Sequence, residues 1–170
     1  MKKLIVCILF VFLGTQVFAQ DFNDAFTVFK LGKKFIAVKM YKRLAEQGGL
    51  RAQSALSSMY LFGDGVNKDT AIAYKYAKLA AVNQTLGSIH YKADAQYHVA
   101  WSYAYGHGVT IDFKLAYMWA TIAYANDAWN AESMLSFLDL RLNQQEKNKS
   151  IKMANKCISS NFKKCGYWYE

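Results

Sequence analysis

The chain has 170 residues, of which 54% are hydrophobic and 16% aromatic, and its formal net charge at pH 7 is +9. That length is enough for one domain with a buried core. The lysines are scattered along the chain rather than gathered in one dense block. A basic balance is typical of proteins that bind nucleic acid or an anionic envelope surface, or that only have a charged exterior, and we interpret this one as a charged exterior.

Residues 1–19 have the parts of a secretory signal peptide. Two lysines form a basic start, residues 4–13 are an unbroken apolar run, and Val17-Phe18-Ala19 gives a cleavage pattern. The apolar run is too short to cross a bilayer, which needs about 20 residues, so a membrane anchor is the weaker alternative. We therefore predict export to the periplasm or the exterior. The mature chain would begin near Gln20, and loss of both lysines lowers its net charge from +9 to +7.

One phrase of the sequence occurs twice, with every matched residue shifted by 43 positions. It contains an alanine–glutamine pair, a tyrosine, a Gly-x-Gly-Val turn, an aspartate and an alanine–tyrosine pair. The matched residues are Ala52, Gln53, Tyr60, Gly63, Gly65, Val66, Asp69, Ala73 and Tyr74 in the first copy, and Ala95, Gln96, Tyr103, Gly106, Gly108, Val109, Asp112, Ala116 and Tyr117 in the second. Self-similarity at such a period predicts a repeat architecture whose stacked units bury a shared core.

Each copy is predicted to be two helices joined by a glycine turn, which makes the fold class all-α. Alanines around Tyr76 recur at the spacing of one helix face. Glycines in the turn are expected to adopt positive φ and to end the first helix. These turn glycines are Gly63, Gly65, Gly106 and Gly108. Asp69 and Asp112 are expected to cap the start of the second helix.

The two repeats are expected to lie between terminal units of a different kind. The predicted parts are an N-terminal capping helix pair at 20–49, a first repeat at 50–83, an inter-repeat loop at 84–91, a second repeat at 92–126 and C-terminal capping helices with a tail at 127–170. The loop accounts for seven surplus residues, because the pattern resumes at Ala131 only 36 positions after Ala95. Asn143 to Glu146 has the pattern of a capping box for the last helix.

Two cysteines, Cys157 and Cys165, remain once the signal peptide is removed. An even number of cysteines in an oxidising compartment predicts a disulfide, here one that holds the end of the last helix to the tail. Free buried thiols are the alternative. A metal site is not indicated, since no nearby histidine completes a set of four ligands.

Taken together, these features resemble the Sel1-like repeat family, in its exported bacterial type. The resemblance rests on the two copies of the phrase, covers about residues 22–160 and includes Leu44-Ala45-Glu46-Gln47-Gly48 after a basic helix. It implies a right-handed α-solenoid of stacked antiparallel helix pairs, related to tetratricopeptide repeats, that binds proteins and carries no chemistry. This chain departs from the family at Tyr76, where a tryptophan is usual.

No residue pattern indicates a catalytic centre, a cofactor or a metal. His90, His98 and His107 lack the spacing of a helical metal pair, and no Gly-x-Ser-x-Gly motif occurs. We therefore expect a non-catalytic scaffold or adaptor. The alternatives are a cell-envelope hydrolase, a β-lactam-interacting repeat protein or a purely structural, self-associating protein. The β-lactam alternative comes from exported members with a cysteine pair in each repeat, and the repeats of this chain contain no cysteine.

Aromatic residues are the candidates for a binding surface, because tyrosine and tryptophan dominate binding hot spots. Most are expected in the core and a minority on the concave face of the solenoid. The candidates are Tyr97, Tyr105, Tyr117, Tyr124 and Trp168. The expected partner is a protein or peptide, with the basic charge favouring an acidic one, and neither nucleic acid nor a transmembrane anchor is expected. Self-association through the aromatic tail remains an alternative.

Overall fold

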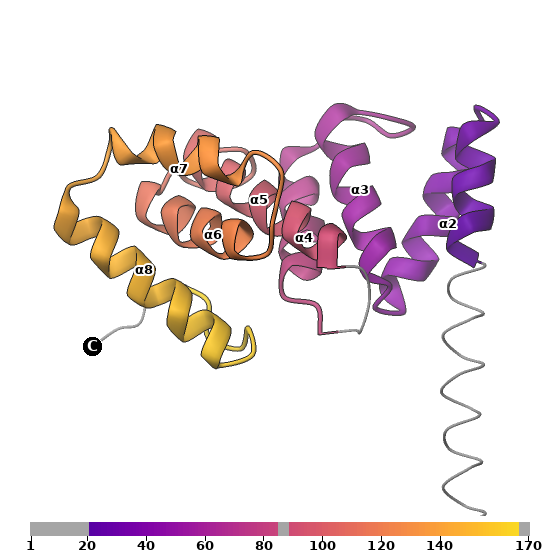
Figure 1. Cartoon of the computed structure of the whole chain (residues 1–170). Coiled ribbons are helices and arrows are strands. Elements are labelled where there is room, and N and C mark those ends of the chain that lie inside the picture. The colour runs from indigo at the N-terminus through magenta and orange to yellow at the C-terminus, as the bar shows by residue number, and fades with distance from the viewer. Residues whose placement is uncertain (1–20, 85–88, 167–170) are drawn as a thin grey trace, which may run out of the picture.

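The described part of the chain, residues 21–84 and 89–166 of a computed structural model, is built from helices and contains no strand. Residues 21–30 form the first helical segment. It is followed by α2 (Lys34–Glu46), α3 (Leu50–Phe62), α4 (Thr70–Ala81), α5 (Ile89–Tyr105), α6 (Phe113–Ala125), α7 (Ala131–Asp139) and α8 (Gln144–Ser159) (Figure 1). The predicted all-α fold class is confirmed.

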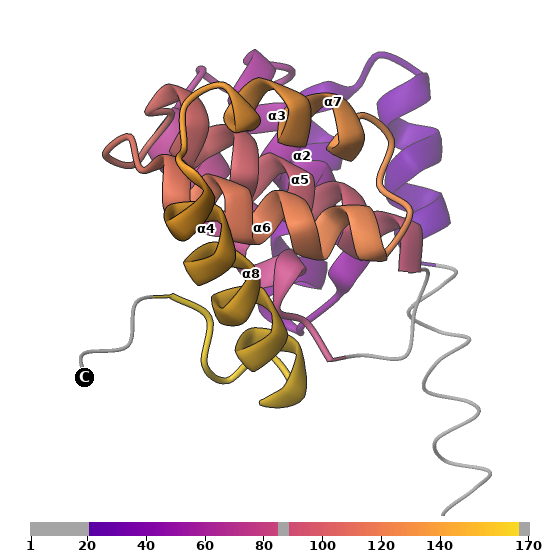
Figure 2. The same ribbon diagram turned by 60° about the vertical axis from the view of Figure 1, so that its left-hand side comes forward.

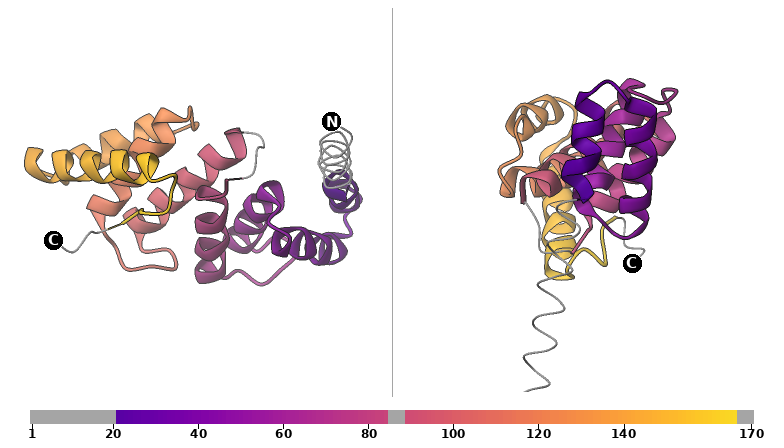
Figure 3. Two further views of the ribbon diagram at one scale, coloured as in Figure 1. Left: turned by 90° about the horizontal axis from the view of Figure 1, so that it is seen from below. Right: turned by 90° about the vertical axis from the view of Figure 1, so that its right-hand side faces the viewer.

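The helices are stacked in chain order as antiparallel pairs. Each of α2 to α6 packs on the next helix along the chain. The last helix, α8, packs on α6 instead, and α6 lies between α7 and α8 in Figure 2. The chain therefore advances from the indigo end of the molecule to the yellow end (Figure 3). This arrangement is a helical solenoid in which most contacts join neighbouring units.

The Gly-x-Gly turns bring neighbouring units into close contact. Gly63 and Gly106 have φ of 74°, and Gly65 and Gly108 have φ of 78°, a backbone conformation that other residues adopt at a cost. The second glycine of each turn also packs on the start of the preceding unit's second helix. A Cβ at Gly108 would collide with the carbonyl oxygen of Thr70. A hydrogen atom is thus the only side chain that fits there.

Side-chain caps begin the helices that the sequence predicted. Asp69 Oδ1 accepts a hydrogen bond from the backbone N–H of Ile72 at 2.9 Å. Asp112 caps α6 in the same way. Asn143 and Glu146 exchange hydrogen bonds of 3.0 Å with each other's backbone N–H, which is a complete capping box at the start of α8.

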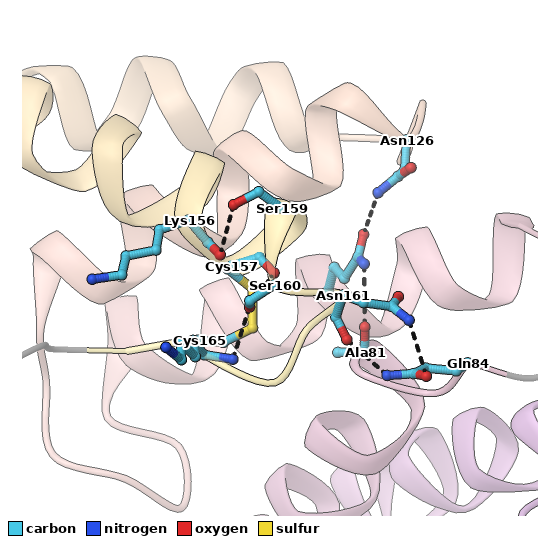
Figure 4. The surroundings of a disulfide bond; sticks show 11 residues. Ala81, Gln84, Asn126, Lys156, Cys157, Ser159, Ser160, Asn161 and Cys165 are labelled. Carbon is cyan, nitrogen blue, oxygen red and sulfur yellow. Dashed lines mark hydrogen bonds between the residues drawn. A yellow bond between two sulfur atoms is a disulfide. The ribbon is translucent and has the colours of Figure 1, made fainter.

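The buried glutamine of each repeat links the ends of two neighbouring helices. Gln96 Nε2 donates to the carbonyl oxygen of Ala81 at the end of α4 at 3.2 Å, and Gln96 Oε1 accepts from Asn126 Nδ2, just after α6, at 2.9 Å (Figure 4). Gln53 makes the matching contacts with the ends of α2 and α4. Both glutamines are buried, and their hydrogen bonds satisfy polar groups that would otherwise be desolvated without a partner.

α5 begins at Ile89, so residues 89–91, which the sequence assigned to the inter-repeat loop, are helical. The physical reason lies in the neighbouring helices. The ring of Tyr91 packs edge-on against Phe22 at 6.4 Å and lies 5.3 Å from the Arg51 guanidinium. These contacts stabilise an extra turn at the start of α5.

The predicted disulfide is confirmed. Cys157 near the end of α8 is bonded to Cys165 in the following segment, eight residues later. Between them, Asn161 exchanges hydrogen bonds with Gln84, which follows α4, at 2.7 and 3.1 Å (Figure 4). The bridge therefore closes the segment that contains Asn161, which contacts the end of the first repeat.

A lysine lies against the largest core residue of the second repeat. Lys78 Nζ is 4.3 Å from the centre of the Trp119 ring, which is fully buried. Burial lowers the pKa of Lys78 from 10.5 to about 8. The charged form is therefore disfavoured in the folded state, although the face of the indole partly offsets that cost.

We expect Lys78→Met to remove part of the pH dependence of stability. Between pH 8 and 10.5 the unfolded chain holds the Lys78 proton and the folded chain does not, so the free energy of unfolding rises with pH in this window. The contribution is about 2 kcal/mol once the partial exposure of the side chain is considered. Denaturant unfolding of the wild type and Lys78→Met across this range measures the difference. Lys75→Met, on an exposed position of α4, is the control; equal pH slopes for all three proteins would contradict the expectation.

Candidate binding surface

The first helices of successive pairs lie next to one another: α3 contacts α5, α5 contacts α7, and residues of 21–30, α3 and α5 line one pocket. The face that these first helices form is here called the first-helix face. At its N-terminal end is a pocket of about 350 Å³. Its walls are three phenylalanines of the first helical segment, residues of α3 and Tyr91 of α5. Phe26 and Phe62 at the pocket are 45% and 74% exposed, which is unusual for rings of this size. The pocket is thus a concave, mostly apolar site.

One cation lies in the wall of this pocket. The guanidinium of Arg51 is 3.9 Å from the centre of the Phe22 ring and also lies against Tyr91. Its Nε is buried without a hydrogen-bond partner, and the side chain pairs with no carboxylate of the described residues. A buried donor without a partner costs about 1–3 kcal/mol. Burial raises the pKa of Tyr41 in the same pocket, and Arg51 opposes that rise.

An ion pair lies beside the pocket. Asp64 lines it, and its carboxylate is 2.6 Å from Lys34 Nζ. The ammonium of Lys34 is also 5.6 Å from the centre of the Phe29 ring. The carboxylate of Asp64 is neutralised by Lys34, so the guanidinium of Arg51, which pairs with no described carboxylate, gives the pocket a net positive charge.

The difference between the two repeats explains why the pocket exists. Ala55 and Ser58 line it in the first repeat. The residues 43 positions later are His98 and Trp101. The ring of Trp101 stacks on His107 at 4.1 Å and 15°, so the second repeat carries a large ring where the first repeat has a hydroxymethyl group. Small side chains in the first repeat therefore leave space that the second repeat fills.

Toward its C-terminal end, the first-helix face carries a cluster of aromatic rings and one arginine. It consists of Trp101, Tyr105, His107, Phe137 and Arg141. Tyr105 lies 5.3 Å from Phe137, and the Arg141 guanidinium is 3.5 Å from the centre of the Phe137 ring. Tyr105 is 43% exposed, so the cluster presents part of its surface to solvent. The first-helix face thus has an open pocket at its N-terminal end and a partly exposed aromatic cluster toward its C-terminal end.

The predicted binding residues lie on two different helices. Tyr97 and Tyr105 are on α5. The pKa of Tyr97 is raised, mainly by burial and to a smaller extent by the nearby Tyr105. Tyr117 instead donates a hydrogen bond to Asp139 at 3.4 Å, and Asp139 pairs with Lys147 of α8 at 2.8 Å. Tyr117 is therefore directed toward the α6–α7–α8 side.

Tyr124 is exposed on α6, the second helix of its pair, and Trp168 lies outside the described residues. The predicted aromatics of the described residues therefore lie on α5 and α6, and their role in binding stays a prediction. The pocket residues Phe22, Arg51 and Tyr91 were not predicted. The signal that could have found this region is the contrast between Ser58 and Trp101 at matched positions of the repeats.

Other chemistry has little support in the described residues. Among them, no group of three or more His, Cys, Asp or Glu side chains could hold a metal ion. Across 21–84 and 89–166, no helix is both long enough and apolar enough to cross a membrane. His98 is half-buried, desolvation lowers the pKa of its imidazole, and its buried Nδ1 has no hydrogen-bond partner among the described residues.

The sequence pattern of the Sel1 repeat family matches residues 33–49, 50–81 and 93–127. These segments coincide with α2, the α3–α4 pair and the α5–α6 pair. The chain is a Sel1 repeat protein. The conclusion agrees with the turns, caps and buried glutamines described above.

A solved structure shows the same fold. A protective antigen present in uropathogenic Escherichia coli strains, displaying an SLR fold, superposes with a TM-score of 0.73 and 22% sequence identity. The comparison covers 90% of this chain and 34% of the antigen. This likeness concerns the fold alone.

Two curated relatives are named exopolysaccharide production negative regulator. The protein of Rhizobium meliloti (strain 1021) is 37% identical over 68 residues, and that of Rhizobium leguminosarum bv. viciae is 38% identical over 68 residues. Each match covers 39% of this chain, and the chain spans about a quarter of the length of these relatives.

Proposed function

We propose that this Sel1 repeat protein is an exported, non-catalytic binding module whose first-helix face holds a segment of another protein. The observation that carries the proposal is the open, mostly apolar pocket between residues 21–30, α3 and α5, next to a partly exposed aromatic cluster. Aromatic and arginine side chains around a pocket are typical of binding hot spots. Sel1 repeats mediate protein–protein interactions, and a stacked-helix face offers a long surface for a peptide.

Export is the second part of the proposal. It is supported by the signal-peptide pattern of residues 1–19 and by the Cys157–Cys165 disulfide, a bond that persists in oxidising compartments. The basic mature chain favours an acidic partner, whose association rate would fall as salt screens the charges. The name of the Rhizobium relatives is compatible with an adaptor that regulates by binding.

Affinity capture with surface variants tests this function. The protein is recovered from the periplasmic fraction and from the medium. An intact mass equal to that of a chain that begins near Gln20 would establish export. Phe62→Glu replaces the exposed ring at the pocket with a carboxylate. Leu79→Glu makes the same kind of change at an exposed apolar residue of α4, which is the second helix of its pair. We expect Phe62→Glu to weaken partner capture at least about tenfold, the effect of losing one hot-spot anchor.

The control variant Leu79→Glu should capture the partner as the wild type does. Equal capture by all three proteins would move the interaction away from the first-helix face. A pure protein that turns over an envelope substrate while capturing no partner would contradict the non-catalytic function. Concentration-dependent assembly of the pure protein without a second component would favour the self-associating alternative.

A further inference from the structure

We propose that the pocket beside Arg51 recognises one aromatic or leucine-sized side chain together with a nearby Asp or Glu side chain of the bound protein segment. The inference rests on the proposed function and adds the chemistry of the occupant. It is argued from the shape of the pocket, from its charge and from the second repeat of the same chain.

The shape of the pocket fits an apolar side chain. Its volume of about 350 Å³ is at the lower end of the range of about 300–1,000 Å³ that is usual for ligand pockets, and rings form much of its wall. A helix or a folded element is too large to enter, whereas a single anchoring side chain is the usual occupant of such a site in an interface.

The charge of the pocket fits a carboxylate. The guanidinium of Arg51 lies 3.9 Å from the centre of the Phe22 ring and 5.3 Å from that of Tyr91, and these two contacts restrict its position in the pocket wall. Arg51 forms no ion pair or hydrogen bond with another described side chain, whereas Asp64 is already paired with Lys34. A guanidinium presents several N–H groups in one plane, which matches the two oxygens of a carboxylate.

The second repeat shows that this face accommodates a ring. Trp101, at the position equivalent to Ser58, places its indole on the first-helix face and contacts both core clusters. The first repeat has the same helix–turn–helix backbone but lacks this ring, so a ring supplied by another chain can occupy the vacant position. We infer that the partner's anchor takes the place in the first repeat that Trp101 takes in the second.

The experiment uses a random library of short peptides, selected against the mature chain. Selected peptides are resynthesised with both ends blocked, so that Asp and Glu side chains are their only carboxylates. We expect an aromatic residue or leucine close to an acidic residue. Replacing the acidic residue with its amide should weaken binding to the wild type about tenfold, as expected for the loss of one charge-assisted contact.

Two variants separate the pocket from the charge. Ser58→Trp fills the pocket with the side chain that the second repeat already has, and should weaken binding of the selected peptides more than about tenfold. Arg51→Met retains an apolar stem and should bind the acidic and amide peptides equally. Ser136→Trp, which adds an indole to an exposed position of α7, is the matched control, and thermal unfolding shows whether each variant is folded.

Three results would overturn the inference. These are selected peptides without an acidic residue, peptides that bind folded Ser58→Trp as tightly as the wild type, or a preference for the acidic peptide that persists in Arg51→Met. None of these results affects the proposed function if Phe62→Glu still reduces capture of the native partner. Conversely, if the native partner is captured equally by the wild type and by Phe62→Glu, the proposed function is contradicted even if the pocket binds such peptides.

Discussion

Replacing Gly108 with alanine is expected to lower the free energy of unfolding by about 2–5 kcal/mol. A residue with a Cβ at φ 78° costs about 1–2 kcal/mol through its own backbone conformation. The added Cβ would also collide with the carbonyl of Thr70 and lie 2.8 Å from the Cα of Ala71. These atoms belong to the backbone at the start of α4 and can move only if two units separate, which adds about 1–3 kcal/mol.

Gly32→Ala is the matched control for this experiment. Gly32 has φ of 77°, but a Cβ there would have no atom within 4 Å. Its substitution therefore measures the backbone cost alone, about 1–2 kcal/mol. Denaturant unfolding of both variants, followed by circular dichroism, gives the difference that belongs to the contact between units. Equal losses for Gly108→Ala and Gly32→Ala would contradict the role of Gly108 as a contact point.

Replacing Trp119 with alanine is expected to cost about 3–5 kcal/mol, the usual range for a fully buried aromatic side chain. Trp119 has no exposed surface and belongs to the core cluster that joins α4, α5, α6 and α8. Its removal would leave a cavity among helices of two repeats and one terminal unit. The loss should therefore appear in the main unfolding transition rather than in the fraying of one end.

Tyr76, 43 positions earlier, is the internal comparison for this substitution. It is half-buried and stacks on Tyr60 at 6.0 Å and 16°. Tyr76→Ala should cost only about 1–2 kcal/mol, because less apolar surface returns to water. A Tyr76→Ala loss as large as that of Trp119→Ala would mean that the two repeats contribute equally to the core, against the difference in burial.

The sequence alone determined the local parts of this protein. Gly-x-Gly turns, the Asp69 and Asp112 caps and the capping box at Asn143 depend on backbone conformation and on N–H groups two or three residues away. Such interactions lie within a few residues of one another, so their pattern is legible in one chain. The repeated phrase then predicted the two central helix pairs and their order.

The tertiary structure decided what the solenoid presents to a partner. Helical spacing shows which residues share a face of one helix, but the neighbour that covers that face depends on how the pairs are rotated against each other. The position of Tyr117 beside Asp139, for example, follows from the packing of α6 against the segment that ends α7 and could not be predicted from the sequence. The pocket required Phe22, Arg51 and Tyr91 from three separate helices to meet beside Ser58, and only the stacking of those helices brings them together.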